Sequence, residues 1–547
     1  MKSDLFFAKG TGCEMADFDT IVIGSGSGGL TAAVALANAG QKVLVLEQHY
    51  LPGGWTHSFP LHGHLFSPGV HYLGELQSGG MMRAIFEGLG MGGDLEFYEL
   101  NPDGVDHVIV GDERFDIPAC VDTFEARLIG RFPEEETGIR RYFRFARKIV
   151  RELARLTNLS GGPLSVLKLP FLAPRTALFG LRPIGKIIRR HCRDPFLRTI
   201  LEVRAGDHGV DPLRVPCAQH LGVESHYWNG GWYPRGGGAA LPKAYLKQLR
   251  ARGGEIRLRS KVEKILIEGG RAVGVVIEDG DELRAGNVLS NADSEVTYRT
   301  LVGDDHLSAG LRRRLVKTEY SISAVSLFMA SRLDPRAAGL DSGNYWICSE
   351  PDVPATYDYA LKKNLDDEGV PPGLFLTVTS LKDPGKLQDG IHTMEAFSLV
   401  SYDAFEGWRR GATGERGGEY EAFKEVLKDR MLAGLERVVP GLRDSLAFCD
   451  VGSPLTNDHY VNAFRGNAYG TAKVAGQIGP FSFPLKTEIP GLYHCGSSTV
   501  SHGVMGVMIS GLEAAAKILG RPSSSLLNTA GGTITLRSAE EETQALS

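Results

Sequence analysis

Short apolar runs alternate with glycine-rich turns along much of the chain, and the first of these runs predict an α/β beginning. Residues Asp19–Ile23 form a strand pattern, Gly29–Ala39 a helical pattern, and Lys42–Leu46 a second strand pattern. Gly40 stands where the helix should end. Together these segments predict a β-α-β unit with parallel strands and a right-handed crossover.

Similar segments recur in the middle and near the end of the chain. Polar residues beyond Arg521 predict a flexible C-terminal segment over 521–547, and residues 1–16 are expected to be a flexible N-terminus. The remaining elements that the pattern predicts are a hairpin at His107–Ile117, helices at Pro133–Asn158, Ala239–Arg252, Gly418–Val438 and Gly506–Leu519, and strands at Glu255–Leu258, Val262–Glu268, Ala272–Glu278, Ile322–Met329, Leu374–Val378, Thr393–Val400 and Gly491–Cys495.

The order of these segments predicts two interleaved domains. At 547 residues the chain is longer than one ordinary domain. We expect a nucleotide-binding domain assembled from 17–75, 231–300 and 450–520. A second domain is expected from 76–230 and 301–449.

Composition narrows the class of protein. The chain is 42% hydrophobic and 23% charged with a net charge of -5, which is typical of a soluble globular protein and gives no footprint for nucleic-acid binding. Its seven cysteines are odd in number and never spaced as CxxC, so we expect neither a disulfide framework nor a metal site. No apolar run reaches the roughly 18 residues of a spanning helix. These features predict a cytoplasmic location.

The turn after the first strand carries the chemistry. Gly24, Gly26 and Gly29 match GxGxxG between a strand and a helix, and Glu47 ends the next strand. The first two glycines allow a tight turn and close approach of a pyrophosphate, and the third allows close helix–strand packing. The carboxylate of Glu47 is placed to accept hydrogen bonds from an adenosine ribose. The motif therefore predicts a dinucleotide site.

A second glycine pair bears on which dinucleotide is bound. Gly53 and Gly54 resemble the turn that flavoproteins of the glutathione-reductase type bring near the pyrophosphate. Residues Trp55–His57 stand where disulfide reductases of that type carry redox cysteines. No second strand–GxGxxG–helix unit for NADPH follows. We therefore expect a flavoprotein without thiol–disulfide chemistry.

Four stretches resemble the phytoene desaturase superfamily, and within it the retinol saturase and carotenoid isomerase branch. They are the run from Gly24 to Gly74, Tyr233–Gly237, Lys261–Ala292 and Tyr493–Gly511. The resemblance implies an FAD-binding Rossmann domain of the glutathione-reductase type, interleaved with an α+β substrate domain that carries a mixed or antiparallel sheet. It also implies that the ADP half of FAD lies on Gly24, Gly26, Gly29 and Glu47. The further residues that it implies at the cofactor are Gly53, Gly54, Val262, Gly496, Gly506, Val507 and Met508.

The same resemblance implies hydride transfer between the flavin and carbon–carbon bonds of a hydrophobic polyene, as a saturase, desaturase or cis–trans isomerase. By position, His71, Tyr72 and His502 are candidates for proton transfer beside the flavin. Alternatively they are hydrogen-bonded residues of the cavity wall. The electron partner stays open among NAD(P)H, a quinone and oxygen. An amine-oxidase or protoporphyrinogen-oxidase type of flavoprotein and a non-catalytic prenyl-lipid carrier of the same fold are the alternatives.

One segment bears on how a hydrophobic substrate would enter. Residues Leu164–Arg193 are apolar with seven basic residues and no acidic residue. Such a segment could lie in a membrane interface, with cations at anionic head groups. It could equally form a helix pair over the substrate domain. Peripheral membrane contact is therefore one of two expectations here.

Overall fold

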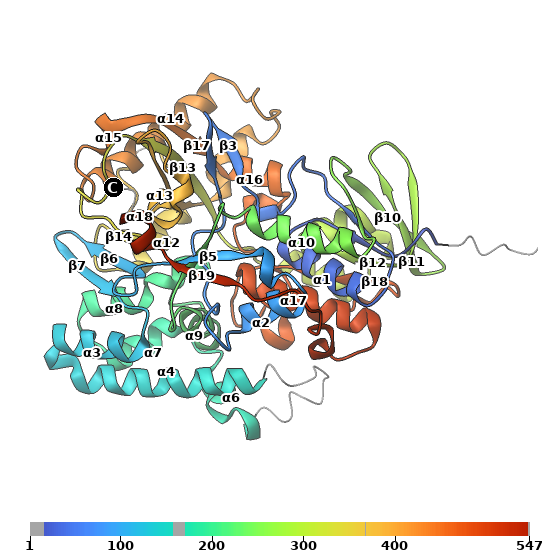
Figure 1. Cartoon of the computed structure of the whole chain (residues 1–547), viewed down its shortest axis with the longest axis horizontal. Helices are drawn as coiled ribbons and strands as arrows, with labels where there is room; N and C mark the ends of the chain where they lie inside the picture. Colours follow the sequence, from blue (N-terminus) through green and yellow to red (C-terminus); the bar gives the residue numbers. More distant parts are fainter. Residues whose placement is uncertain (1–15, 157–169, 367, 545–547) are drawn as a thin grey trace, which may run out of the picture.

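The computed structural model describes residues 16–156, 170–366 and 368–544. In these residues two seven-stranded sheets stand side by side (Figure 1). A three-stranded sheet, β19–β5–β8, and a two-stranded sheet, β3–β4, accompany them. The strands of the three-stranded sheet are β5 (Glu96–Glu99), β8 (Trp232–Pro234) and β19 (Thr535–Ser538).

The first sheet is built on the predicted β-α-β unit. β1 (Phe18–Ile23) leads into α1 (Ser27–Asn38) and then β2 (Val43–Leu46), and β1 and β2 pair in parallel. Eleven of the twelve α1 residues are buried, since two other helices pack against it. Those helices are α10 (Ala240–Ala251) and α17 (Gly503–Leu519), and the other strands are β9 (Glu255–Arg257), β10 (Val262–Glu268), β11 (Arg271–Ile277), β12 (Glu282–Ser290) and β18 (Leu492–His494).

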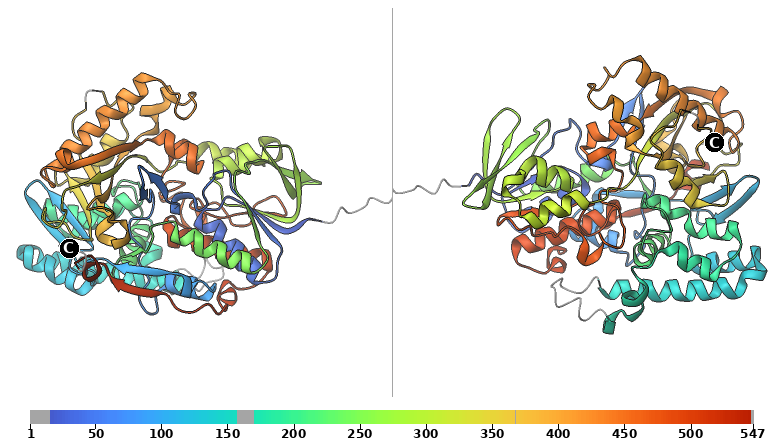
Figure 2. Two further views of the ribbon diagram at one scale, coloured as in Figure 1. Left: turned by 45° about the horizontal axis from the view of Figure 1, so that its top comes forward. Right: turned by 180° about the vertical axis from the view of Figure 1, so that it is seen from behind.

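The second sheet has helices on both faces, as all views agree (Figures 1 and 2). One face packs against α3, α4, α7 and α8, and the other against α14. Its strands run in the order β17–β13–β16–β15–β14–β6–β7, and only β14 and β6 pair in parallel. The bounds are β6 (Asp106–Val110), β7 (Glu113–Ile117), β13 (Ser323–Ser331), β14 (Asn344–Cys348), β15 (Gly373–Val378), β16 (His392–Val400), β17 (Leu446–Gly452), α3 (Val121–Arg131), α4 (Glu136–Leu156), α7 (Ile184–His191), α8 (Pro195–Glu202) and α14 (Gly418–Glu436).

Shorter elements complete the described chain. They are β3 (Phe59–Leu61), β4 (His64–Phe66), α2 (Met81–Gly88), α6 (Pro174–Phe179), η4 (Val203–Asp207), α9 (Cys217–His226), α11 (Ala309–Lys317), α12 (Val353–Ala360), α13 (Thr379–Lys382), α15 (Leu442–Ser445), α16 (Pro454–Val461) and α18 (Ala539–Gln544). The mixed and antiparallel sheets confirm the predicted fold class, and the hairpin at His107–Ile117 is confirmed as β6 and β7. The division into two interleaved domains stays a prediction.

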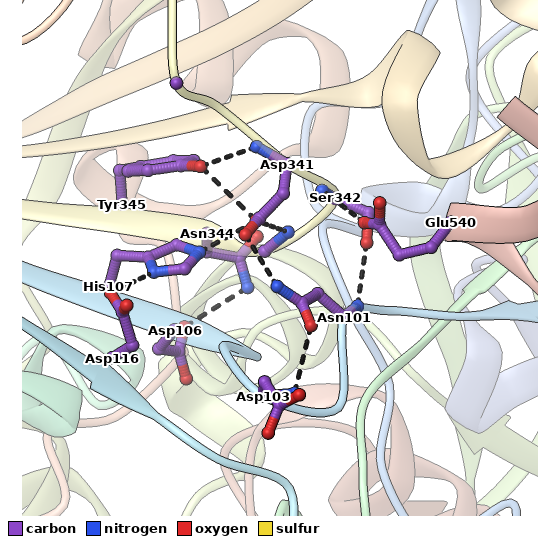
Figure 3. Close-up of polar contacts among 12 residues, drawn as sticks. Asn101, Asp103, Asp106, His107, Asp116, Asp341, Ser342, Asn344, Tyr345 and Glu540 are labelled. Atoms are coloured by element: carbon purple, nitrogen blue, oxygen red, sulfur yellow. Dashed lines mark hydrogen bonds and ion pairs between the residues drawn. The ribbon is translucent and has the colours of Figure 1, made fainter. Parts of the chain in front are cut away.

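The prediction of a flexible segment after Arg521 is wrong for the described residues. β19 pairs in parallel with β5, and α18 follows it. Figure 3 shows Glu540 of α18 reaching the loop before β14, where its carboxylate accepts a hydrogen bond of 3.0 Å from the Ser342 N–H. It also forms a 2.8 Å ion pair with Arg336. The polar composition misled the prediction because the segment gains its order from partners hundreds of residues away.

Candidate active site

A cavity of about 520 Å³ begins at the glycine turn after β1 and continues to the second sheet. Its first part is lined by Ile23, Leu46 and Asn291, at the carboxyl ends of β1, β2 and β12. Ligands of open α/β sheets bind at this edge. Its second part is lined by Ala324 and Phe397, from β13 and β16. The cavity therefore has two connected parts. The first, called the cradle below, is lined by glycine turns at Gly24–Gly28, Gly53–Gly54 and Gly496. The second, called the chamber, lies over the second sheet and is lined by Ala324, Phe375, Phe397 and Leu399.

The first glycine turn is as close-packed as the motif predicts. Gly24 has a φ of +89°, which strongly favours glycine, and a Cβ on Gly29 would lie 2.3 Å from the Gly24 carbonyl oxygen. A Cβ on Gly28 would lie 2.7 Å from Oδ1 of Asn291. Gly29 does not line the cavity, so it acts by letting α1 start close to the turn. The motif leaves the amino end of α1 open toward the cavity. The N–H groups and the positive end of the helix dipole there favour binding of a phosphate.

The second glycine turn meets the first. Gly53 has a φ of +122°, and a Cβ on Gly54 would lie 3.2 Å from the Cα of Gly26. Glu47 is buried at the cavity wall, where its carboxylate accepts hydrogen bonds from the Ser25 N–H at 2.9 Å and the Ser25 hydroxyl at 2.6 Å. The same Ser25 oxygen accepts a 3.0 Å hydrogen bond from the Gly53 N–H. Ser25 therefore ties the carboxylate and both turns together.

The third part of the cradle comes from the C-terminal region. Gly496 has a φ of +97°, and Gly496, Gly506, Val507 and Val262 all line the cavity. The predicted helix start at Gly506 is corrected, because α17 begins one turn earlier, at Gly503. The open N–H groups of its first turn are therefore those of residues 503–506.

Met508 is the predicted cofactor residue that the structure places differently. Its side chain is fully buried in the core between the helices and the first sheet and does not line the cavity. The reason is the close crossing of α1 and α17, where a Cβ on Gly511 would lie 2.0 Å from the Gly28 carbonyl oxygen. Met508 fills space beside this crossing.

The far part of the cavity is apolar and aromatic. His71 lies beside the stacked rings of Phe375 and Phe397, with ring centroids 5.1 and 5.9 Å away. Its Nε2 lies 3.2 Å from Oε2 of the buried Glu395, and its carbonyl oxygen accepts a 2.7 Å hydrogen bond from Lys382. Burial lowers the pKa of Lys382 to about 7. His71 is therefore held at the wall by two buried ionisable groups.

Tyr72 and His502 also line the cavity, and Asp207 brings them together. The Tyr72 hydroxyl donates to the Asp207 carboxylate at 3.0 Å, and its ring stacks on Tyr227 with centroids 4.1 Å apart. Nε2 of His502 lies 2.7 Å from the Asp207 carbonyl oxygen, an acceptor, so this nitrogen carries a proton. Burial and the charge of Lys473 lower the pKa of His502 to about 3, and the ring is neutral at physiological pH.

A neutral buried His502 gives a pH-dependent stability. The unfolded chain binds a proton at this residue below its ordinary pKa of about 6.5, whereas the folded protein does not until about pH 3. Stability therefore falls as pH drops from 6.5, by about 2 kcal/mol at pH 5 from this group alone. Urea unfolding at pH 7.5 and pH 5 measures this loss of stability. We expect the free energy of unfolding of His502→Gln to fall less between these pH values than that of the wild type, because glutamine binds no proton.

The exposed His306 supplies the matched control for that measurement. His306→Gln should keep the pH dependence of the wild type. Equal pH dependence of His502→Gln and the wild type would contradict a neutral His502.

Four further residues of the site are not predicted by the sequence pattern: Asn291, Glu395, Lys382 and Asp207. Asn291 lay within a stretch that carried the family resemblance, next to the strand end, and could have been found there. The other three come from elements that lie more than a hundred residues after His71 and Tyr72 in the sequence. Their proximity to His71 and Tyr72 arises only from the folded second sheet.

Comparison with known proteins places this site in a family. The model for flavin-containing amine oxidoreductases matches residues 27–329. All-trans-retinol 13,14-reductase of Danio rerio is 29% identical over 535 residues, covering 92% of this chain and 86% of the relative. Prolycopene isomerase of Daucus carota is 28% identical over 524 residues, covering 92% and 80%. These relatives match the branch that the sequence motifs resemble.

Solved structures agree on the fold. An oxidoreductase from Methanosarcina mazei superposes with a TM-score of 0.61 at 17% identity, covering 90% of this chain and 99% of the other. Putrescine oxidase bound to putrescine gives 0.62 at 16% identity, covering 92% and 99%. The chain belongs to the flavin-containing amine oxidoreductase family and is a flavin-dependent oxidoreductase.

Proposed function

We propose that the chain is an FAD-dependent oxidoreductase that acts on carbon–carbon double bonds of a hydrophobic polyene of the retinoid or carotenoid kind. The observation that carries the proposal is the continuity of the cavity, from a close-packed glycine cradle to a chamber lined by Phe375, Phe397 and Leu399. Relatives named for retinol reduction and prolycopene isomerisation cover nearly the whole chain. The flavin, when bound, supplies the hydride chemistry.

The chain's own residues would hold FAD as follows. The first glycine turn and the amino end of α1 suit its pyrophosphate, because Gly26 and Gly28 line the cavity and carry no side chain that would keep the backbone N–H groups away from it. Glu47 stands at the cavity wall where an adenosine ribose would need an acceptor. The first turn of α17, at Gly503, offers N–H groups and a positive helix end to the ring system.

The substrate chamber would orient an extended apolar chain and exclude water from it. Phe375 and Phe397 stack with centroids 4.7 Å apart beside His71, and Ala324 and Ser326 leave room on the neighbouring strand. A long polyene buries apolar area along such a wall, at about 25 cal/mol per Å². The chamber therefore fits a hydrophobic substrate better than a charged one.

Product analysis with a substrate panel tests the function. FAD-loaded protein is incubated with all-trans-retinol, with cis- and trans-carotenoids and with putrescine, and the products are separated by chromatography. A polyene that gains or loses two hydrogens, or changes its cis–trans ratio, is the expected result. Oxidation of the amine with every polyene unchanged would overturn the proposal. Denaturing the protein and identifying the released flavin by mass tests FAD against FMN.

We also propose that α6 touches a membrane surface. Residues 164–169 of the predicted segment lie outside the described residues, and α7 is not part of the contact because Ile184, Ile187 and Ile188 are buried. In contrast, Leu178 of α6 is 62% exposed, and Phe171 and Leu181, which lie just before and just after α6, are 86% and 48% exposed. No helix in the described part of the chain combines the length and apolar character needed to cross a bilayer.

Charge around α6 favours an anionic surface. α4 packs against α6 (Figure 1). Five basic side chains of α4 line a shallow surface pocket. They are Arg140, Arg144, Arg147, Lys148 and Arg151. We expect Phe171→Asp/Leu178→Asp to lose binding to anionic lipid vesicles in a sedimentation assay while keeping flavin. The double variant Val316→Asp/Leu361→Asp, at exposed apolar residues elsewhere, is the control. Equal sedimentation of both variants and the wild type would contradict the contact.

A further inference from the structure

A carboxyl group that the function above does not use reaches the cavity wall at Asp207. It ends η4, between the second sheet and the loop that precedes α17. The carboxylate accepts the 3.0 Å hydrogen bond from Tyr72. The guanidinium of Arg204 nearby is engaged by Asp106 at 2.6 Å and Glu224 at 2.8 Å. Asp207 is therefore anchored by a neutral donor, and its charge is not matched by a partner of its own.

We propose that Asp207 donates the proton that completes saturation of a carbon–carbon double bond in this cavity, with Tyr72 holding the carboxyl group in place. The inference rests on the polyene function proposed above and adds the acid to it. Saturation adds a hydride equivalent to one carbon and a proton to its neighbour. A reduced flavin, when held in the cradle, would supply the hydride with its two electrons. The proton comes from the carboxylic acid, whose O–H bond breaks as the C–H bond forms, and water then restores it.

The surroundings of Asp207 keep a proton available near neutral pH. Burial raises its pKa to about 7, and the charge of Asp106 adds to the shift. Glu224 is a third carboxyl group facing the same Arg204, and burial raises its pKa too. The Arg204 guanidinium therefore lies near three carboxyl groups. It forms ion pairs with Asp106 and Glu224, and Asp207 is the carboxyl group of the three that has no ion pair to it. An acid with a pKa near the working pH is best suited to proton transfer.

The other groups around Asp207 do not supply this proton. Burial raises the pKa of Tyr72 well above its usual range, so its hydroxyl keeps its proton and serves as a donor of a hydrogen bond. Burial does the same for Tyr227, Tyr357 and Tyr469, which face the carboxyl group from three other elements. His502 is neutral and its Nε2 proton is bound to the Asp207 carbonyl oxygen. His71, paired with Glu395, is the rival that an experiment must separate.

Transient kinetics with chemically reduced, FAD-loaded protein separates these groups. For Asp207→Asn we expect saturation of a bound polyene to slow roughly 10²–10⁴-fold, the usual contribution of a general acid. Flavin affinity and polyene affinity, measured by titration, should stay within a few-fold of the wild type. The wild-type rate should fall as pH rises through about 7, and Asp207→Glu should restore part of the rate and this pH limb. Asp358→Asn, at an exposed residue of α12, is the control.

A readout without cofactor or substrate accompanies the kinetics. A carboxyl group whose pKa is raised on folding binds more protons in the folded state, so its contribution to stability falls as pH rises from about 4 to 7. The melting temperature of Asp207→Asn should therefore rise relative to that of the wild type between pH 5 and pH 8. A constant difference over this range would overturn the protonated Asp207.

The outcomes keep the two proposals apart. If the wild type saturates a polyene and Asp207→Asn does so equally fast, or if only His71→Gln slows the step, the inference fails and the function stands. If the wild type converts no polyene while the melting data show Asp207 titrating near pH 7, the polyene function fails, and with it the donor role.

Discussion

Replacing Gly29 by alanine is expected to abolish flavin binding and to lower the free energy of unfolding by about 1–3 kcal/mol. The added Cβ would lie 2.3 Å from the Gly24 carbonyl oxygen and 3.1 Å from Cβ of Asn291. No backbone can accept a methyl group at that distance, so the amino end of α1 must move away from the turn. The pyrophosphate would then lose its hydrogen bonds to the N–H groups of the glycine turn and of the first turn of α1. Flavin fluorescence titration and denaturant unfolding measure the two effects.

Gly130→Ala is the matched control. Gly130 lies in α3, and a Cβ there meets nothing within 4 Å. The same added methyl group should leave flavin binding unchanged and stabilise the helix by roughly 0.5–1 kcal/mol. Wild-type flavin affinity in Gly29→Ala would show that the cradle does not hold the cofactor in the way described.

Replacing Arg204 by methionine is expected to cost about 3–5 kcal/mol of stability, because it leaves buried carboxylates without their cation. The side chain of Arg204 is 2% exposed and that of Asp106 is fully buried, and Glu224 also binds this guanidinium. The loss should shrink at acid pH, since burial raises the pKa of Glu224 and protonation removes the uncompensated charge. Urea unfolding at pH 7.5 measures the loss of stability, and the same measurement at pH 5 shows whether the loss becomes smaller.

The control for this variant is Arg140→Met. Arg140 pairs with Glu136 at 2.8 Å on the exposed face of α4, where its side chain is 55% exposed. Exposed pairs of this kind contribute about 0.3–0.5 kcal/mol. A loss for Arg204→Met no larger than that of the control would mean that the cluster is solvated rather than buried.

Local pattern was sufficient for the elements of the first sheet and for the glycine turns. The run from Asp19 to Leu46 alternates strand, turn and helix within thirty residues, so the pattern that predicts it is contained in neighbouring residues. The start of α17 was missed by one turn because Gly503 and Gly506 both allow a helix to begin. β19 was missed because its partner, β5, lies more than four hundred residues earlier.

The chemical groups at the far end of the cavity could not be predicted for the same reason. Position beside a family motif was enough to propose His71, Tyr72 and His502, and all three line the cavity. Nothing near Asp207 in the sequence indicates that its carboxyl group meets Tyr72, 135 residues earlier. Its raised pKa depends on burial and on Asp106 of β6, and both arise only once the second sheet has folded.

The central claim is that the cradle and the apolar chamber together bring a flavin to a polyene. An anaerobic half-reaction tests it most directly: FAD-loaded protein is reduced chemically, mixed with an all-trans retinoid or a carotenoid, and followed by flavin absorbance and product chromatography. We predict return of the oxidised flavin spectrum with a product two hydrogens heavier, or, for an isomerase, a changed cis–trans ratio with the flavin still reduced. Desaturation would appear in the converse experiment, as bleaching of oxidised flavin by a more saturated polyene. A flavin that stays in its starting state in both directions, with the polyene unchanged in hydrogen content and configuration, would contradict the account.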